Sequence, residues 1–370
     1  MANRTLKVVA ASLMALSMVG ALTGCASDDS TAEDSETTSQ ASERNAELDA
    51  LIEQAKEEGA LTITWAVYPD AVNTELIEAF KDEYDLDIPV QIAFESNIDT
   101  LAAKLTEESE AGVEASSDLF LTTAATAASV GSSGSDLIEP QDWASFSPWN
   151  ADFSEADGEF LVVGHQFPGF IYNTNTVDEN DLPTTASDVL KMTDYAIAST
   201  PYGASFNTLA IGMGGPEAVE AYLAEFEPAG LINCGEVSRV ASGEFDAMWV
   251  GCGKSYVDEG VKDGAPLGYV SVSDGAVANS VYVAVPKNSE HPAAAALFAA
   301  WLNTSTAQQI TWDGTAIDNA QLEGSHSADY IAELKAEGTD VQVVDVAFVL
   351  ENPQYFDSEF KSAIVALLSK

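Results

Sequence analysis

The fold of this chain is decided by residues 61–94, which read LTITWAVYPDAVNTELIEAFKDEYDLDIPVQIAF. Apolar and polar side chains alternate over 61–68, as in a half-buried strand, and 72–84 carries an apolar stripe at helical spacing. Residues 90–94 are again rich in strand-forming side chains. A strand, a helix and a second strand in this order predict a β-α-β unit.

The same alternation continues on both sides of this unit. We expect helices at 46–58 (ending at Gly59), 98–110, 206–213, 216–226, 255–262 and 292–302, and strands at 118–122, 196–199, 245–250, 280–286 and, as two pieces, within 159–173. Strands that alternate with helices predict a parallel sheet covered on both faces. About 310 residues follow Gly59, which is more than one core usually serves, so two lobes are expected.

The first residues have the pattern of an export signal. Arg4 and Lys7 precede an uncharged apolar run over 8–22, and its last residue opens the tetrapeptide Leu22-Thr23-Gly24-Cys25. The run is short for a membrane-spanning helix, so that reading is the weaker one. The last four residues resemble the bacterial lipobox, which implies that Cys25 is lipidated; the alternative is that it is only a small apolar residue of the run. Residues 26–45 are mostly Ser, Thr, Asp and Glu and predict a disordered acidic tether.

The charge of the chain restricts its partners. Sixty acidic residues against fourteen basic ones give a formal net charge of −46. Nucleic acids and anionic lipid surfaces would be repelled, so neither is an expected partner. A hydrated acidic surface fits an exported protein in a salty medium, where the short Debye length screens the repulsion between like charges.

Two cysteines remain after Cys25, namely Cys234 and Cys252. An even pair in an oxidising compartment predicts a disulfide. Two buried free thiols and a metal site are the alternatives. The three histidines are scattered far apart and show no metal-ligand spacing, so we expect no bound metal.

The segments that resemble catalytic or nucleotide-binding motifs each lack a required residue. The segment GCGKS at 251–255 resembles the end of a P-loop, but Met248 stands where the first glycine is required. The glycines at 212–215 lack the last glycine of a dinucleotide fingerprint and predict a helix end. No Gly-x-Ser-x-Gly elbow occurs. We therefore predict no catalytic residue and no cofactor, although a serine and a histidine can still meet in space.

Several short segments follow one another in a characteristic order. They are LTITW at 61–65 with a helix ending at Phe80, SDLFL at 117–121, FIYNT at 170–174 with LPTT at 182–185, ASGEFDA at 241–247, PLGYV at 266–270, and VPKN at 285–288 before His291-Pro292. This order resembles the extracellular solute-binding proteins of ABC importers, in the branch that includes ferric-iron, thiamine and phosphonate binders. The resemblance covers nearly the whole mature chain.

The resemblance implies an α/β, two-lobed periplasmic-binding-protein fold of type II-like topology. Each lobe is a mixed sheet flanked by helices, and the ligand lies in a cleft between the lobes. The implied division is a lipoprotein signal peptide at 1–25, the tether at 26–45, the first lobe at 46–160, the second lobe at 161–276, a return to the first lobe at 277–312, and a C-terminal helical segment at 313–370 that packs on the second lobe or the hinge.

The same resemblance implies which residues line the cleft. The candidate ligand-binding residues are Val67, Tyr68, Glu95, Ser96, Asn97, Thr122, Thr123, Tyr202, Ala204, Ser205, Gly253, Lys254 and Tyr256. Simpler interpretations stay open for several of them. Lys254 can be a surface lysine, the tyrosines can be core aromatics, and the threonines and Ser205 can cap helices.

The ligand class follows from departures from the family's iron-binding pattern. Iron-binding members use two adjacent tyrosines, a histidine and an acid; here Gly253-Lys254, about Pro69 and about Ala124 stand at these places. A lysine is a poor metal ligand but a good counter-charge, so a small polar solute, anionic or zwitterionic, is expected.

The predicted function is that of a monomeric, lipid-anchored solute-binding protein on the extracellular face of the bacterial membrane, which delivers its solute to an ABC permease and is not an enzyme. Three alternatives remain open: an iron(III)-binding member of the same family, an exported hydrolase, and a sensory or adhesive lipoprotein. A Ser–His contact in the cleft would favour the hydrolase.

Overall fold

The computed structural model describes residues 45–66, 68–95, 98–132, 136–251 and 253–370. The predicted signal peptide with Cys25, and all but the end of the predicted tether, lie outside these residues. Within the described residues, no helix combines the length and the apolar character that crossing a membrane requires.

The β-α-β unit predicted from residues 61–94 is confirmed. Strands β1 (Leu61–Trp65) and β2 (Val90–Phe94) pair in parallel, and α2 (Asp70–Tyr84) connects them. β1 ends earlier than the predicted 61–68. The reason is Asn73 in α2, which accepts a hydrogen bond from Trp65 Nε1 and donates one to the carbonyl of Tyr68, so the chain after Trp65 is held against the helix.

The first helix is also as predicted. In α1 (Ala46–Glu58), the side chain of Asn45 caps the first turn and Gly59 ends the helix at φ 78°, a conformation that favours glycine. The carboxylate of Glu58 accepts hydrogen bonds from the amides of Ala293 and Ala294, both at 2.9 Å. These amides belong to the first turn of α12 (Pro292–Trp301), where backbone N–H groups have no acceptor within the helix. Glu58 supplies the acceptor and thereby attaches the end of α1 to the start of α12.

The first sheet is mixed. β11 (Val277–Ala284) is antiparallel to both β3 (Phe120–Thr123) and β5 (Phe160–Gln166), and a parallel bridge between Ile63 and Leu119 joins β3 to β1. The short strands β4 (Ser154–Glu155) and β12 (Gln342–Val344) extend it. The expectation of a wholly parallel sheet is thus wrong here, while the mixed sheet implied by the resemblance is confirmed.

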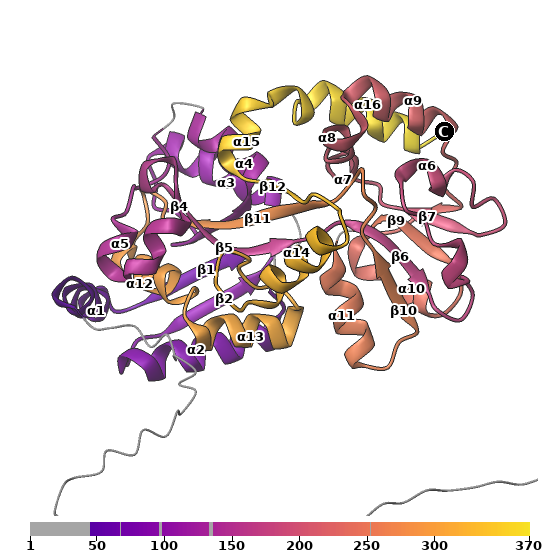
Figure 1. The fold of residues 1–370 in the computed structure, drawn as a ribbon. Coiled ribbons are helices and arrows are strands. Elements are labelled where there is room, and N and C mark those ends of the chain that lie inside the picture. Colours follow the sequence, from indigo (N-terminus) through magenta and orange to yellow (C-terminus); the bar gives the residue numbers. More distant parts are fainter. Residues whose placement is uncertain (1–44, 67, 96–97, 133–135, 252) are drawn as a thin grey trace, which may run out of the picture. The chain divides into compact units, whose positions relative to one another are not determined.

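The second sheet has the order β10-β6-β9-β7-β8. Its strands are β6 (Gly169–Asn173), β7 (Ile197–Ser199), β8 (Gly230–Leu231), β9 (Ala247–Gly251) and β10 (Leu267–Val270). β7 runs parallel to β8 and β9, whereas β6 is antiparallel to β9 and β10. In Figure 1 the strands β6, β7, β9 and β10 lie in the pink to salmon part of the ribbon, at the right of the view.

Helices cover both sheets. Beside the first sheet lie α3 (Ile98–Ala111), α4 (Ala124–Ser132), α5 (Trp143–Phe146), α13 (Ser305–Thr315) and α15 (Val346–Glu351); beside the second lie α6 (Ala186–Val189), α7 (Gly203–Asn207), α8 (Leu209–Met213), α9 (Pro216–Glu225), α10 (Ser238–Ala241), α11 (Lys254–Lys262) and α16 (Ser358–Leu368). α14 (His326–Ala336) lies in the middle, where its Tyr330 contacts the rings of Phe167 and Tyr269. As predicted, α8 ends at a glycine, Gly214, at φ 91°.

The chain has separate hydrophobic cores. One surrounds the first sheet and includes Trp65, Phe80, Phe298 and Trp301, whose rings pack against one another. The second sheet has its own buried clusters, to which α16 contributes. We call each sheet with the helices on it a lobe.

The chain crosses between the lobes from α15 to α16, and two strand connections also join them: β5 runs into β6, and β10 runs into β11. Tyr269 ties these two connections together, because its hydroxyl lies 2.9 Å from the carbonyl of Phe167 and 3.0 Å from that of Pro168. A Cβ on Gly169 would stand 2.5 Å from the Tyr269 hydroxyl oxygen, so this close approach needs glycine.

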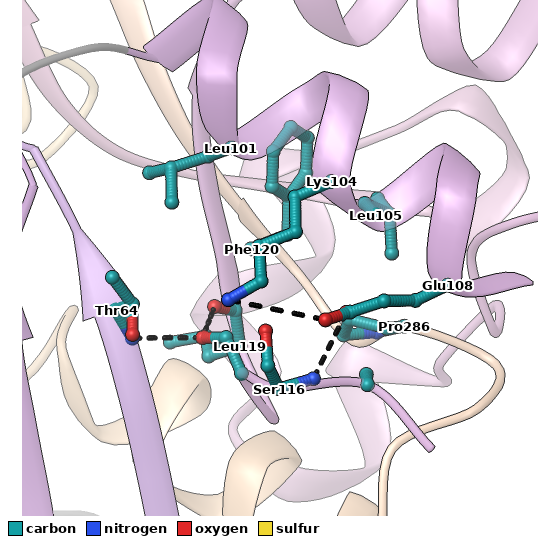
Figure 2. Close-up of a pocket in the computed structure, with 11 residues that line it drawn as sticks. Thr64, Leu101, Lys104, Leu105, Glu108, Ser116, Leu119, Phe120 and Pro286 are labelled. Atoms are coloured by element: carbon teal, nitrogen blue, oxygen red, sulfur yellow. Dashed lines mark hydrogen bonds and ion pairs between the residues drawn. The ribbon is translucent and has the colours of Figure 1, made fainter. Parts of the chain in front are cut away.

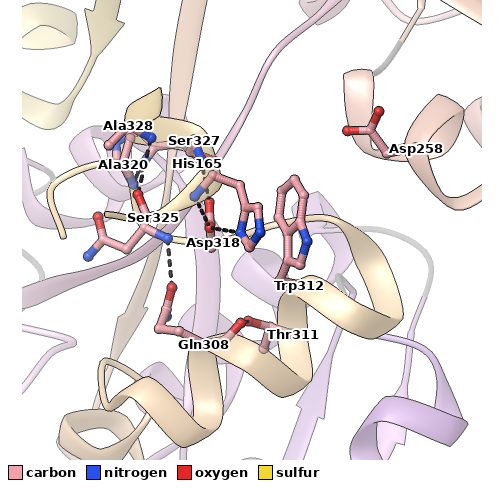
Figure 3. A network of polar contacts seen from close by, with 12 residues as sticks. His165, Asp258, Gln308, Thr311, Trp312, Asp318, Ala320, Ser325, Ser327 and Ala328 are labelled. Carbon is pink, nitrogen blue, oxygen red and sulfur yellow. Dashed lines mark hydrogen bonds and ion pairs between the residues drawn. The ribbon is translucent and has the colours of Figure 1, made fainter. Parts of the chain in front are cut away.

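A polar network holds β5 just before this connection (Figure 3). The backbone amide of His165 donates to the Asp318 carbonyl at 2.9 Å. The ring Nδ1 of His165 accepts from the Ala320 amide at 3.0 Å. The carboxylate of Asp318 in turn accepts from the amides of His326 and Ser327. The segment after α13 is thereby fastened to β5.

The C-terminal helix packs on the second lobe. Phe360, Ile364 and Leu368 of α16 are buried there, against α7 and α9. The backbone contact is tight: a Cβ on Gly203, at the start of α7, would stand 2.5 Å from the Lys361 carbonyl oxygen.

Candidate functional site

The candidate residues of the first lobe stand at one edge of its sheet. β1, β2 and the start of β3 run in the same direction, as the parallel pairing and the Ile63–Leu119 bridge show. Tyr68 follows β1, Glu95 follows β2, and Thr122 and Thr123 close β3. The carboxyl ends of parallel strands meet at one edge, which is where α/β proteins bind ligands.

The second lobe repeats this arrangement. β7 and β9 are parallel neighbours, with Ser199 opposite Trp249. Tyr202 follows β7 at the start of α7, and Gly253, Lys254 and Tyr256 follow β9 at the start of α11. Sequence order had placed these residues after strands; the register shows that the two strand ends are adjacent.

One candidate from each edge lies near the end of β5 or the connection that follows it. The Lys254 amide donates to the Phe167 carbonyl at 2.8 Å. From the first lobe, the hydroxyl of Tyr68 lies 3.9 Å from the place that a Cβ on Gly164 would take. Lys254 is thus hydrogen-bonded to this stretch and Tyr68 lies near it, although the two candidates are 186 positions apart in the sequence.

Tyr68 is fully buried and rigidly placed. Its ring stands edge-on to Trp65 at 5.0 Å between centroids. Burial, assisted by the negative charge of Asp318, raises the pKa of the Tyr68 phenol well above its usual range, so this hydroxyl stays protonated at neutral pH and is available as a hydrogen-bond donor.

Two threonines at these edges have hydroxyls without a partner. Thr122 and Thr200, which directly follows β7, are completely buried, and neither Oγ1 has a hydrogen-bond partner among the described residues. A buried hydroxyl without a partner is unfavourable by roughly 1–3 kcal/mol, which is why such groups are often found where something else binds. Thr200 was not among the sequence candidates; its position directly after a predicted strand was the available signal.

Lys254 lies within a small charged cluster. Its Nζ is 2.6 Å from Asp258 Oδ2, four residues on in α11, and 5.1 Å from the centroid of the Tyr330 ring. The side chains of Lys254 and Asp258 are 26% and 25% exposed, so the pair is partly shielded but open to solvent. Asp258 could have been found from its helical spacing to Lys254. Tyr330 could not, because it is distant in the sequence.

Tyr202 and Tyr256 differ in burial. Tyr202 is 45% exposed, and its hydroxyl donates to Asn233 Oδ1 at 2.7 Å, so it is not a core aromatic. The pKa of Tyr256 is raised, chiefly by burial and further by Glu259 and Tyr202. Tyr256 therefore also remains a neutral donor at neutral pH.

Several candidates cannot be placed. Val67, Ser96, Asn97 and Cys252 lie outside the described residues, as do the side chains of Ala204 and Ser205. Cys234 is disulfide-bonded. Its pairing with Cys252 stays a prediction.

Two pockets in the described part of the chain are lined by other residues. One, of about 30 Å³, lies between α3 and the strands β1 and β3 (Figure 2). Its polar groups satisfy one another: Ser117 Oγ accepts from the Thr64 amide and donates to the Leu119 carbonyl, and Glu108 accepts from the Ser116 amide. The other, of about 310 Å³, lies beside Ile197 at the amino end of β7, away from the candidate edge.

A Ser–His contact does exist, but its geometry opposes nucleophilic catalysis. Ser280 Oγ lies 3.4 Å from His165 Nε2, and both residues are buried. Because Nδ1 accepts from the Ala320 amide, the ring proton is on Nε2 and points to the serine. A general base needs the opposite arrangement, with the unprotonated nitrogen facing the hydroxyl. Nor do the described residues contain a group of three or more His, Cys, Asp or Glu side chains arranged to hold a metal.

Two mixed α/β lobes joined by crossing strands, with candidate polar groups at the strand ends of each, define a two-lobed binding protein. The chain belongs to the bacterial extracellular solute-binding protein family, whose model matches residues 75–336. It is a solute-binding protein of the kind that serves ABC transporters.

Solved structures support the fold at low sequence identity. The substrate-binding protein of an ABC transporter from Agrobacterium tumefaciens superposes with a TM-score of 0.67 at 14% identity, over 84% of this chain and 97% of the other. Iron-bound HitA from Pseudomonas aeruginosa gives 0.63 at 18%, over 83% and 99%. AfuA from Actinobacillus pleuropneumoniae, with fructose-6-phosphate bound, gives 0.62 at 16%, over 83% and 97%. A search of the curated proteins finds no match.

Proposed function

We propose that this chain captures a small polar organic solute between its lobes, at the strand ends that carry Tyr68, Thr122, Tyr202 and Lys254, and passes it to an ABC permease. The observation that carries the proposal is that one candidate from each lobe comes close to the end of β5 and the connection that follows it: Lys254 through its amide and Tyr68 through its hydroxyl. Donors from two lobes are thereby brought to a hinge, where closure can surround a solute.

The charges favour a zwitterionic solute over a simple anion. Lys254 offers one cation, but Asp258 lies 2.6 Å from it, so the pair together carries no net charge. A zwitterion can interact with both members, whereas an anion is attracted by Lys254 and repelled by Asp258. The neutral hydroxyls of Tyr68, Tyr256 and Thr122 would then donate to its carboxylate or hydroxyl oxygens.

Stabilisation of the folded protein by its solute tests this proposal. Melting temperatures would be compared with and without amino-acid-like zwitterions, carboxylates, phosphate esters, phosphonates, polyamines and ferric citrate, since a ligand of the folded state must raise the melting temperature. The site is supported if Lys254→Met abolishes the shift while Lys191→Met preserves it. Lys191 is a matched control, because it pairs with Asp188 at 2.7 Å but is 73% exposed.

Other outcomes separate the alternatives. A shift with ferric citrate alone would favour the iron-binding member of the family. A solute-dependent shift that Lys254→Met leaves intact would place the solute elsewhere. Turnover of a screened ester, lost in Ser280→Ala, would favour the hydrolase against the tautomer argument above.

We further propose that the protein is a monomer anchored to the extracellular face of the membrane by a lipid on Cys25. The support is the lipobox-like LTGC at 22–25 together with the extracellular family. Intact-mass measurement of the membrane fraction should show a diacylglycerol adduct that disappears in Cys25→Ala, and an unmodified Cys25 in the mature protein would contradict it.

A further inference from the structure

One face of α11 carries three charged residues at helical spacing. Lys254, Asp258 and Lys262 stand four residues apart, so they line the same side of the helix. α11 packs on β10 and β6 of the second lobe, and this side contacts α13, which packs on α2 of the first lobe. Figure 3 shows Asp258 across from Trp312 in this region.

Lys262 makes a contact between the lobes that involves no solute-binding candidate. Its Nζ donates to the carbonyls of Trp312 and Asp313, at 3.2 and 3.0 Å. Both carbonyls belong to the last turn of α13, which ends at Thr315 and where the helix dipole favours a cation; the Trp312 carbonyl also accepts from the Ala316 amide. The same ammonium lies 5.8 Å from the centroid of the Trp312 ring, within range of a cation–π interaction.

The first lobe holds the receiving side of this contact in place. The indole of Trp312 stacks on the His326 ring, with centroids 3.8 Å apart and planes 1° from parallel. His326 Nδ1 lies 3.1 Å from the carboxylate of Asp318, whose side chain is only 4% exposed. Because the Asp318 carbonyl accepts from the His165 amide in β5, Trp312 is fixed to the strand that enters the lobe connection.

We propose that Lys262 is a latch for lobe closure: a positioning residue that stabilises the closed arrangement without touching the solute. Opening the lobes would pull the ammonium away from both carbonyls and from the indole, and nothing in the second lobe replaces them within the described contacts of Lys262. The contact therefore exists in one state and not in the other, which is what shifts a two-state equilibrium.

The latch rests on the proposed capture by closure but makes a prediction that needs no solute. In the unliganded protein, loss of a partly exposed cation contact of this kind should raise the ratio of open to closed molecules roughly fivefold. Affinity for any solute that requires closure would fall by a similar factor, because the competent state is less populated.

The test is a distance measurement between the lobes. Spin labels on noncanonical residues at Glu75 in α2 and Ala224 in α9, both exposed, would report the separation by pulsed electron resonance in the unliganded full chain. Lys262→Met keeps the length of the side chain and removes its charge, Lys262→Arg keeps the charge, and Lys191→Met removes a charge elsewhere on the second lobe.

We expect a larger long-distance population in Lys262→Met, and wild-type distributions in Lys262→Arg and Lys191→Met. Trp312→Leu, which removes the ring but leaves both carbonyls, should give an intermediate result. Identical distributions in wild type and Lys262→Met would overturn the latch, as would a fall in melting temperature with unchanged distances, which would mean only local support. Because no solute is added, failure here leaves the solute-binding proposal standing.

Discussion

Burial of His165 should make the stability of this protein depend on pH in a specific window. Burial lowers the pKa of His165 to about 4, and the negative charge of Asp318 opposes this only in part. The imidazole is therefore neutral in the folded protein, whereas in the unfolded chain its pKa is about 6.5. Between these values the unfolded state binds a proton that the folded state does not.

The sign and size of the effect follow from linkage. Stability contributed by the neutral ring is complete above about pH 6.5, is lost as the pH falls toward 4, and changes no further below that. At about 1.4 kcal/mol for each pKa unit, the loss between pH 7 and pH 4.5 is about 2–3 kcal/mol. Many carboxylates titrate in the same pH range, so measurements on the wild type alone cannot isolate the contribution of His165.

The comparison with His165→Asn isolates the effect. The asparagine oxygen can still accept from the Ala320 amide but does not titrate, so its stability lacks the histidine contribution to the pH dependence. Urea unfolding followed by tryptophan fluorescence would give the free energy of unfolding of both proteins at pH 7 and 4.5. We expect the wild type to lose about 2–3 kcal/mol more than the variant over this range. An equal loss in both would refute a neutral, buried His165.

Three further changes test the packing. Gly203→Ala should lower the free energy of unfolding by about 1–3 kcal/mol, because the new Cβ meets the Lys361 carbonyl at 2.5 Å, whereas Gly235→Ala, with no atom within 4 Å, should be neutral in the same urea titration. Glu58→Ala leaves two amides of α12 without their acceptor and should cost about 1–2 kcal/mol, against no change for the exposed Glu57→Ala; equal melting temperatures would contradict the cap. Cys234→Ser should destabilise by about 3 kcal/mol, and peptide mapping without reductant should find Cys234 linked to Cys252; a free thiol at Cys252 would show that the pairing is wrong.

The candidate site was predictable only in part. Glu95, Tyr202 and Lys254 follow predicted strands, and each follows a strand in the structure; Tyr68 and Thr122 fall within predicted strands, and the structure has Tyr68 after β1 and Thr122 inside β3. Their neighbours were not readable from the sequence. Asp258 beside Lys254, Asn233 beside Tyr202 and the unpartnered hydroxyl of Thr200 depend on how helices and loops pack.

The sequence by itself determined the local structure of this protein. Its apolar spacing predicted α1, the β-α-β unit, the later helices α3, α8, α9, α11 and α12 and the strands β3, β5, β6, β7, β9 and β11, because periodicities of 3.6 and 2 record which face of a segment is buried. It did not predict the short elements or the helices that follow α12. The order of those segments also indicated the family, which the comparison then established.

Only the tertiary structure decided the contacts between distant segments. β11 runs antiparallel to its neighbours, His165 is held by Asp318 and Ala320, and Lys262 meets the end of α13, fifty residues away. Periodicity says that a face is buried or exposed but not what lies against it. That choice is made by the packing of the whole chain, in which residues far apart in sequence satisfy one another's charges and hydrogen bonds.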